Sequence, residues 1–512
     1  MLTQTIIESG AVRGVPTSNP DITVFRGIPF AAPPVGDNRW RAPQPVESWN
    51  GVRVCDTYGP PSMQQTPGEN PAEFYTREWY TRPDQPMSED CLYLNVWTPA
   101  RDANEKLPVM VWIFGGGMCF GYTSEMEFDG EHIASHGVVM VSVNYRLNSF
   151  GFLAHRELTE EAAERGEPGT NFGLLDQSAG LRWVKRNIAA FGGDPENVTL
   201  FGQSAGGRCT WMHIAAPSDR GLFHKAIVQS GGLGGGISNY PSLAQSEQAG
   251  AEFLRYLGVS SIAEARRIPA ATLLDRTLTY HGHRWGPTID GTFLPTSPMK
   301  AVASGMAADV RLLLGSTTGD PAGFRMGEDP EKFHRFARTQ YGEDYAEFAS
   351  LSGIDSAEKL REYYNSPSFS PFERGNAFTA GCFAEQGRPP VYLYRFSPDI
   401  PGDDAGAFHS SDLWFVFETL VKSWRPFGDK HYTLARQMGR YWTNFAKNGN
   451  PNGADENGIP LPRWLAAGQD GWHVQWLGND IHSIDEEPDA LMELELRRLR
   501  LEADREKAGG DR

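Results

Sequence analysis

The sequence predicts an α/β fold with a large, mostly parallel central sheet and helices on both faces. Short apolar runs recur along the chain and end in glycine or other turn residues, which is typical of buried parallel strands. Helical patterns separate many of these runs, and strands that alternate with helices indicate this class of fold. The runs lie at residues 109–114, 138–143, 198–201, 226–228, 311–314 and 391–396.

The first hundred residues have a different pattern, with β-rich pieces at 21–30 and 91–97 between proline-rich loops. Farther along, the segment at 174–193 has apolar residues near helical spacing and a pair of glycines where a helix would stop. No internal repeat or low-complexity linker divides the chain. We therefore expect one α/β domain with long insertions over 1–512, and a charged surface helix with a frayed end from about Asp485.

Composition and charge narrow the classes of function. The chain has 512 residues, of which 40% are hydrophobic, and its formal net charge of −17 leaves no basic surface for nucleic acid. An anionic membrane would repel the same charge, and no apolar run approaches the roughly 20 residues of a membrane span. The five scattered cysteines have no metal-ligand spacing and no disulfide framework. We expect reduced thiols in the cytoplasm, no metal, and neither a nucleic-acid nor a membrane partner.

The segment FGQSAGG at 201–207 places a serine between closely spaced glycines. Gly202, Ser204 and Gly206 form the pattern G-x-S-x-G, which alone is weak in a chain with 56 glycines. A strand pattern enters the segment and a helical pattern leaves it, as a nucleophile elbow requires. Such a turn holds the serine on a strained corner, and the first N–H groups of the following helix point at charge developing beside it. Ser204 is therefore the predicted nucleophile.

A second glycine-rich turn follows the apolar run at 109–114. Gly115, Gly116 and Gly117 would let backbone N–H groups approach a substrate oxygen without interference from side chains. Each such donor can stabilise the oxyanion of a tetrahedral intermediate by roughly 3–4 kcal/mol. The alternative is an ordinary strand-to-loop turn, but the elbow elsewhere in the chain favours an oxyanion hole.

A base and an acid must accompany the serine, and twelve histidines compete for the first role. His409 lies in a loop downstream of the run at 391–396, where the chain order Ser, Asp, His places the base. Asp320 follows the run at 311–314, between Ser204 and His409 in sequence, and is the predicted acid. Ser230 lacks a surrounding G-x-S-x-G pattern, so we expect it to line a pocket or to occupy a turn.

These segments resemble the type-B carboxylesterase family, which includes the cholinesterases and the bacterial para-nitrobenzyl esterases. The resemblance runs from about residue 10 to residue 452, in the order typical of the family. The segments that carry it are FRGIPFAAPPVGDNRWRAPQP, SEDCLYLNVWTP, PVMVWIFGGG, VSVNYRLNSFGFL, GTNFGLLDQSAGLRWVKRNIAAFGGDPENVTLFGQSAGG, GAFHSSDLWFVF and YWTNFAKNGNPN. The resemblance implies an α/β-hydrolase fold and a bacterial carboxylesterase.

By position, the resemblance implies Ser204 as nucleophile, His409 as base and Asp320 as the acid that orients the base. Asp320, followed by Pro321, stands where the family usually has Glu. The reaction would form an acyl-enzyme from a small or medium ester, without a metal or an organic cofactor. The implied oxyanion hole consists of the backbone N–H groups of Gly116, Gly117 and Ala205.

The substrate-binding residues are also expected from the resemblance. Gln203 stands where the family usually has Glu beside the nucleophile, so a choline ester is not expected. His281 and His283 fall where cholinesterases have bulky aromatic residues, and Trp285 follows two positions on. We expect a polar acyl pocket that accepts a hydroxylated or carboxylated acyl group near Arg284, unless a difference in loop length turns both histidines to solvent.

Two alternatives stay open at this point. The same fold also serves adhesion proteins that have lost the triad, so a non-catalytic binding protein is the first. The second keeps the acyl-enzyme but directs it at an amide, a carbamate or a thioester, because only the handling of the leaving group differs. All three triad positions hold residues that can do the chemistry, which favours an esterase. Its expected partner is a small-molecule ester substrate. The sequence does not indicate an oligomeric state.

Overall fold

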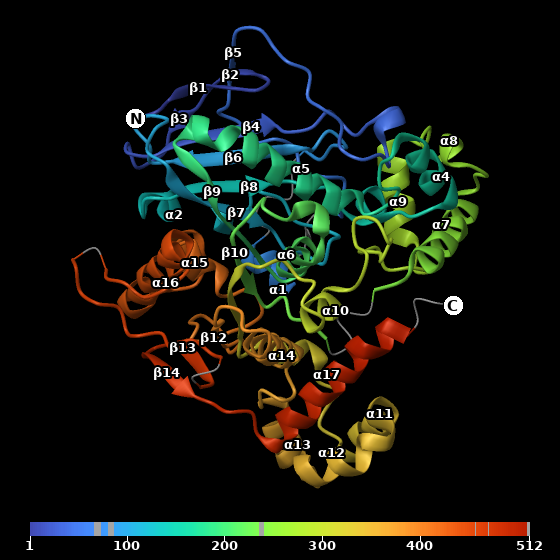
Figure 1. Cartoon of the computed structure of the whole chain (residues 1–512), viewed down its shortest axis with the longest axis vertical. Helices are drawn as coiled ribbons and strands as arrows, with labels where there is room; N and C mark the ends of the chain where they lie inside the picture. The colour runs from blue at the N-terminus through green and yellow to red at the C-terminus, as the bar shows by residue number, and fades with distance from the viewer. Residues whose placement is uncertain (66–72, 80–85, 235–239, 456, 469–470, 509–512) are drawn as a thin grey trace.

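The computed structural model describes residues 1–65, 73–79, 86–234, 240–455, 457–468 and 471–508. Their main feature is an 11-stranded sheet with the order β14-β13-β12-β11-β10-β9-β7-β8-β6-β4-β3 (Figure 1). Neighbouring strands are parallel from β13 to β8, and the strands outside this span pair antiparallel. The predicted sheet, large and mostly parallel, is confirmed.

The strands of this sheet are β3 (Val15–Pro16), β4 (Thr23–Pro29), β6 (Tyr93–Thr98), β7 (Leu107–Ile113), β8 (Val139–Val143), β9 (Gly193–Gln203), β10 (Lys225–Gln229), β11 (Arg311–Thr317), β12 (Tyr392–Ser397), β13 (His473–Gly478) and β14 (Ile481–Asp485). A second sheet joins β1 (Gln4–Ile7), β2 (Gly10–Arg13) and β5 (Val52–Val54). All six apolar runs fall on central strands, and every residue of β8 and β10 is buried. Burial on both faces is the reason that these runs are continuously apolar.

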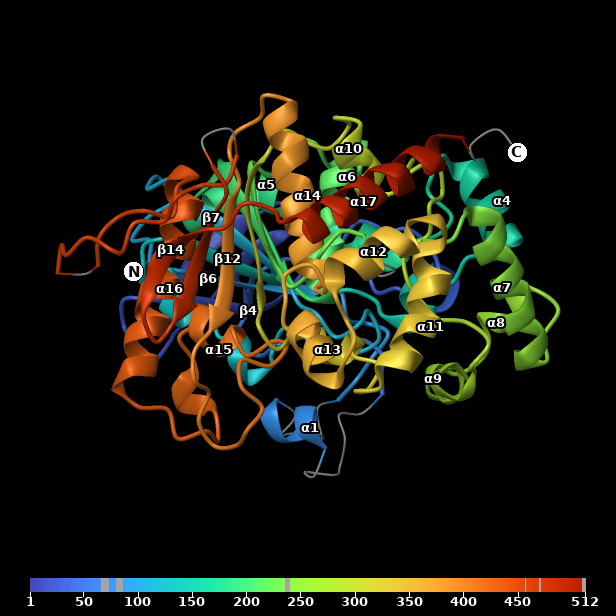
Figure 2. The ribbon, with the colours of Figure 1, turned by 90° about the horizontal axis from the view of Figure 1, so that it is seen from below.

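Helices cover both faces of the central sheet (Figure 2). On one face lie α5 (Phe172–Asn187), α6 (Ala205–Ala215), α10 (Pro298–Ala303) and α14 (Pro371–Glu385). On the other lie α2 (Glu131–Ser135), α15 (Leu413–Val416) and α16 (Asp429–Asn448). The helix predicted at 174–193 is α5, which continues as a 3-10 turn to Phe191 and ends at Gly192, whose φ is 79°. The left-handed conformation of Gly192 accounts for the predicted stop.

The connections between strands hold shorter helices, and the chain ends in a long one. These are α1 (Phe74–Glu78), α3 (Asn148–Phe152), α4 (Arg156–Arg165), α7 (Leu243–Leu257), α8 (Ile262–Ala265), α9 (Ala270–Thr279), α11 (Pro330–Tyr341), α12 (Tyr345–Ser352), α13 (Ala357–Tyr364) and α17 (Ala490–Ala508). In the part of the chain that the structure describes, none of the helices combines the length and the apolar character needed to cross a bilayer.

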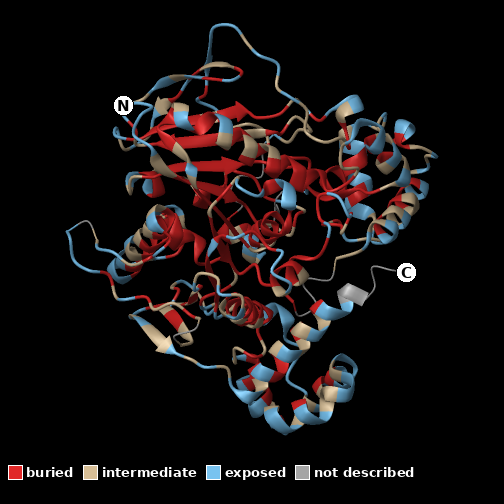
Figure 3. Cartoon of the chain, viewed as in Figure 1, coloured by how far each residue is buried: buried red, intermediate tan, exposed pale blue. Residues whose placement is uncertain are grey.

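Buried residues concentrate around the central sheet, and a smaller apolar cluster lies beneath α11, α12 and α13 (Figure 3). The charged helix expected from about Asp485 corresponds to α17, which also has a buried apolar face, and residues 509–512 at its expected frayed end lie outside the described residues. Helix α17 packs against α10, α12 and α14 and buries Leu494, Leu499 and Ala503. In the sequence, charged residues surround these three side chains, so the apolar face of α17 is difficult to recognise. The prediction of one domain over 1–512 stays a prediction.

The sheet brings the glycine-rich turns and the predicted catalytic residues to one edge. The parallel strands β7, β9, β11 and β12 run in the same direction, so their carboxyl ends lie together. The segment Gly115 to Gly117 follows β7, and Ser204 directly follows β9. Asp320 and His409 follow β11 and β12. Residues that are far apart in sequence therefore meet at this edge.

Candidate active site

Ser204 occupies a sharp turn between β9 and α6. Its φ of 55° and ψ of −121° lie in a region that serine rarely adopts. A Cβ on Gly202 would lie 2.5 Å from the carbonyl carbon of Gly206, and a Cβ on Gly206 would lie 2.0 Å from the carbonyl oxygen of Ile113. Both positions therefore exclude any side chain. This is the strand–turn–helix corner that the sequence pattern predicted.

The structure brings Ser204, His409 and Asp320 into hydrogen-bond contact. His409 Nε2 lies 2.9 Å from Ser204 Oγ, and His409 Nδ1 lies 2.5 Å from Asp320 Oδ1. Asp320 is only 4% exposed, so its carboxylate is largely shielded from water. When a hydroxyl, an imidazole and a carboxylate are hydrogen-bonded in this order, the imidazole can take the proton of the hydroxyl.

The backbone brings the short side chain of Asp320 within reach of His409. The N–H of Gly319 donates to the carbonyl oxygen of Ala407 at 2.9 Å and so ties the two loops together. A Cβ at Gly319 would lie 2.4 Å from that oxygen, which accounts for the glycine. The N–H of Thr317 donates to Asp320 Oδ2 at 2.8 Å. Asp320 Oδ1 is thereby left to face the imidazole.

Ser230 has a contact that the sequence analysis missed. Its hydroxyl donates to Asp320 Oδ2 at 2.6 Å, and the residue is 1% exposed with a φ of 47°. Ser230 directly follows β10, the strand between those that carry Ser204 and Asp320. The expected turn serine is thus also a hydrogen-bond partner of the acid.

Two carboxylates determine the electrostatic environment of His409. Burial lowers the pKa of His409, but the charge and hydrogen bond of Asp320 and the charge of Asp412 outweigh it, so the pKa lies above its usual value. Burial raises the pKa of Asp412 to about 6. Asp412 Oδ2 accepts hydrogen bonds from Gln229 Nε2 at 2.8 Å and Tyr394 Oη at 3.1 Å. The raised pKa of His409 favours the imidazolium that forms when this residue takes a proton.

Backbone N–H groups beside Ser204 are available to a ligand. Gly116 and Gly117 have φ values of 86° and 64°, and both line the cavity at Ser204. Within the described residues, neither amide donates a hydrogen bond to the protein. Ala205 is the first residue of α6, where N–H groups have no partner inside the helix. These are the three groups expected to form the oxyanion hole.

Side chains from two other segments fix the loop that carries these glycines. Gln64 is buried and forms two hydrogen bonds with Gly121, since Oε1 accepts from its N–H at 2.8 Å and Nε2 donates to its carbonyl oxygen at 3.0 Å. Tyr145 donates its hydroxyl to the carbonyl oxygen of Phe114 at 2.9 Å and stacks on the Phe114 ring. Both ends of the loop are therefore anchored.

A cavity of about 140 Å³ opens at Ser204. The side chains that line it include Tyr75, Trp79, Phe120, Glu125, Glu127, Phe128, Gln203 and Leu413. Burial raises the pKa of Glu125 to about 7. Burial and the neighbouring charge of Glu125 raise the pKa of Glu127 well above its usual value. The two carboxyl groups therefore ionise less readily than usual, which lowers the charge that they present to the cavity.

Of the four residues expected to bind substrate, only Gln203 lines the cavity at Ser204. His281 is exposed, and the ring of His283 packs edge-on against Trp285 at 5.1 Å. Trp285 is 6% exposed and packs against Phe253 at 4.8 Å, so an aromatic cluster holds this loop. None of the three lines the cavity at Ser204. Gln203 does line it, and its Nε2 lies 3.4 Å from His409 Nε2.

Known proteins with similar sequences are esterases. A para-nitrobenzyl esterase of Bacillus subtilis is 34% identical over 86% of this chain and 89% of its own length. A fumonisin B1 esterase of Sphingopyxis macrogoltabida is 34% identical over 87% of this chain and 82% of its own. The human cocaine esterase is 31% identical over 91% of this chain and 85% of its own.

Solved structures confirm the α/β-hydrolase fold. A para-nitrobenzyl esterase structure matches 97% of this chain and all of its own, with a TM-score of 0.78 and 31% identity. The carboxylesterase Est55 of Geobacillus stearothermophilus matches 96% of this chain and 99% of its own, with a TM-score of 0.75 and 33% identity. The model of the carboxylesterase family matches residues 3–486. The chain belongs to the carboxylesterase family and is a serine ester hydrolase.

Proposed function

We propose that Ser204, His409 and Asp320 hydrolyse carboxylic esters through an acyl-enzyme. The observation that carries the proposal is the 2.9 Å contact between His409 Nε2 and Ser204 Oγ. The other ring nitrogen faces Asp320, which holds the imidazole in the tautomer whose Nε2 accepts a proton. The strained backbone at Ser204 presents the hydroxyl to the cavity.

Acylation begins when Ser204 Oγ attacks the carbonyl carbon of the ester and its proton passes to His409 Nε2. The negative charge on the former carbonyl oxygen is stabilised by the N–H groups of Gly116, Gly117 and Ala205. The bond from carbon to the alcohol oxygen then breaks, and that oxygen takes the proton from His409. The alcohol leaves, and the acyl group stays on Ser204 Oγ.

Deacylation repeats these steps with water. His409 takes a proton from water as the water oxygen attacks the acyl carbon, and the same N–H groups hold the second oxyanion. The bond from carbon to Ser204 Oγ breaks, and Oγ recovers a proton from His409. The products are a carboxylic acid and the free enzyme, and these steps need no cofactor.

The proposed substrates are small or medium esters, in keeping with the cavity of about 140 Å³ at Ser204. We retain the prediction of a hydroxylated or carboxylated acyl group, but His281 and His283 do not line the cavity. The charge of Arg284 reaches the loop of the oxyanion glycines. Burial raises the pKa of the Cys119 thiol there, and Arg284 opposes the rise. We propose that the charge of Arg284, which is itself exposed, attracts a polar acyl group.

The test is hydrolysis of nitrophenyl esters from acetate to octanoate, with a carboxylated acyl ester in the series. We expect turnover that is lost in Ser204→Ala, and a preference for the carboxylated acyl group that falls in Arg284→Met. Nitroanilide and thioester analogues in the same assay test the alternative leaving groups. Folded wild-type protein without turnover of any of these substrates would contradict the proposal and favour a binding protein.

We also propose a cytoplasmic location, on the basis of the thiols. All five cysteines are free, and Cys91 faces Ser62 rather than a second cysteine. Reduced thiols of this kind are typical of a reducing compartment. Fractionation of the source cells, with the protein followed by antibody, would test the location, and recovery outside the cytoplasm would overturn it.

A further inference from the structure

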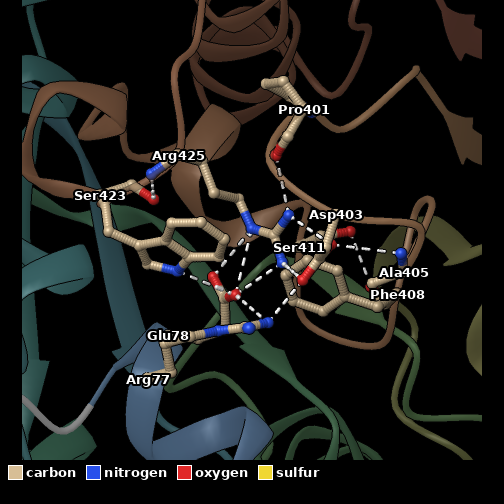
Figure 4. Close-up of polar contacts among 10 residues, drawn as sticks. Arg77, Glu78, Pro401, Asp403, Ala405, Phe408, Ser411, Ser423 and Arg425 are labelled. Carbon is tan, nitrogen blue, oxygen red and sulfur yellow. Dashed lines mark hydrogen bonds and ion pairs between the residues drawn. The ribbon is translucent and has the colours of Figure 1, made fainter. Parts of the chain in front are cut away.

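Four charged side chains form a network beside the candidate active site (Figure 4). Glu78 and Arg425 pair at 2.6 Å, and neither side chain is exposed to solvent. Asp403 binds both Arg425, at 2.8 Å, and Arg77, at 2.5 Å. Two carboxylates and two guanidinium groups balance in charge, which offsets much of the cost of burying them.

Arg425 is the centre of this network because all five of its N–H groups have acceptors. Its Nε and Nη2 donate to Glu78 at 3.0 and 2.6 Å. Its Nη2 also donates to Asp403 at 3.2 Å, and its Nη1 donates to Asp403 and to the carbonyl oxygen of Pro401, both at 2.8 Å. A lysine at this position could not reproduce this planar arrangement with a single nitrogen.

One side of the network holds α1 against the body of the protein. Glu78 is the last residue of α1, and the next residue, Trp79, packs against Trp414 at 4.8 Å. At the start of the helix, Phe74 packs edge-on against Phe408 at 4.8 Å. Tyr75 and Trp79 line the cavity at Ser204. The position of α1 therefore determines the position of one cavity wall.

The other side of the network holds the loop that precedes His409. Asp403 and Pro401 belong to this loop, and both bind the guanidinium of Arg425. The same guanidinium lies over the ring of Phe408, 4.9 Å from its centre. Phe408 is the residue directly before His409. Arg425 thus contacts α1 through Glu78 and the loop of the candidate catalytic histidine through Pro401, Asp403 and Phe408.

We propose that the Glu78–Arg425 network determines which alcohol group the enzyme accepts. This rests on the proposed function, in which His409 gives its proton to the leaving alcohol oxygen. The alcohol must then lie beside His409, in the part of the cavity that Tyr75 and Trp79 enclose. The network fixes the separation of this wall from the loop of His409, and so limits the size of the alcohol that fits. Arg425 and Glu78 are positioning residues that act through Trp79 and Tyr75.

The test compares Arg425→Met with wild-type enzyme on two ester series. One series varies the alcohol of an acetate from ethyl to naphthyl, and the other varies the acyl chain of a nitrophenyl ester. We expect the ratio of kcat/KM between naphthyl and ethyl acetate to rise about fivefold or more in the variant, because a loosened wall admits the larger ring. The acyl-chain preference and the hydrolysis rate of the common acetyl-enzyme should remain unchanged.

Further variants separate this role from a loss of stability. Arg425→Lys should give an intermediate ratio, and Glu78→Gln should change the ratio in the same direction as Arg425→Met. Arg77→Met removes only the ion pair between the half-exposed Arg77 and Asp403. It is the variant to use if Arg425→Met does not fold. Arg395→Met is the matched control, because Arg395 also bridges two carboxylates, Glu373 and Glu486, away from the cavity.

The proposal is overturned if these variants lower the melting temperature but leave the alcohol ratio at its wild-type value. It is also overturned if Arg395→Met changes the ratio as much as Arg425→Met does. Failure of the proposed function has a different signature, since wild-type enzyme would then hydrolyse neither ester series.

Discussion

The hydroxyl of Ser230 donates to the carboxylate oxygen of Asp320 that does not face His409, at a distance of 2.6 Å. This contact and the N–H of Thr317 hold one oxygen of the carboxylate, while the other oxygen binds the imidazole. The orientation of Asp320 is therefore fixed from the side opposite His409.

Ser230→Ala should lower kcat/KM by about tenfold, or about 1.4 kcal/mol, which is the size of one hydrogen bond to a charged group. The control is Thr317→Val, since the buried hydroxyl of Thr317 has no hydrogen-bond partner among the described residues and its N–H is retained. Steady-state kinetics on a nitrophenyl ester measure both variants. Equal losses in the two would show that the hydroxyl of Ser230 has no special role.

Gln64→Leu should lower kcat while leaving KM nearly unchanged. The variant loses both hydrogen bonds to Gly121 and frees one end of the oxyanion loop. A loss of about tenfold in kcat is expected, less than the removal of a whole oxyanion donor. Affinity for a trifluoromethyl ketone, which mimics the tetrahedral intermediate, should fall in parallel. The neighbouring Gln65 is exposed, and Gln65→Leu is the matched control; a similar loss there would contradict the account.

Gly206→Ala should unfold more readily and lose activity. The added Cβ would lie 2.0 Å from the carbonyl oxygen of Ile113, so the backbone at the elbow must shift. Overpacking of this kind costs about 1–3 kcal/mol of unfolding free energy. Thermal unfolding and ester turnover measure the two effects. At Gly286 an added Cβ meets no atom within 4 Å, so Gly286→Ala should leave both unchanged.

The pH dependence of kcat/KM should reflect the raised pKa of His409. The imidazole must be neutral to accept a proton, so activity rises with pH through this pKa. Burial lowers the pKa, but Asp320 and then Asp412 raise it above the usual histidine value. Burial raises the pKa of Asp412 to about 6, so its carboxyl group is mostly ionised above that pH. Asp412→Asn removes its charge, so the acidic limb of the profile should move to lower pH; a limb that stays in place would contradict this assignment.

Local patterns in the sequence predict the strands and the elbow because their physical causes are local. The strands β8 and β10 are apolar on both faces, and Gly202 and Gly206 flank a serine at fixed spacing. Asp320 and His409 are recognisable through their order in the chain and the resemblance to a family. These features do not depend on knowing which distant segments meet.

Contacts between distant segments could not be predicted in this way. Ser230 meets Asp320 only because β10 lies between β9 and β11, and Gln64 reaches Gly121 across 57 positions. Counting along a loop predicts His281 and His283 in the acyl pocket, unless a difference in loop length turns them to solvent. His283 packs against Trp285, which packs in turn against Phe253, and neither histidine lines the cavity at Ser204. The spacing of residues along a loop does not show how the side chains of that loop pack.

The measurement that tests the central claim most directly is the mass of the enzyme after rapid quenching with a nitrophenyl ester. The account predicts one acyl group, located by peptide mapping on the peptide that contains Ser204 and missing in Ser204→Ala. An acyl group on another residue, or turnover that persists in Ser204→Ala, would contradict it.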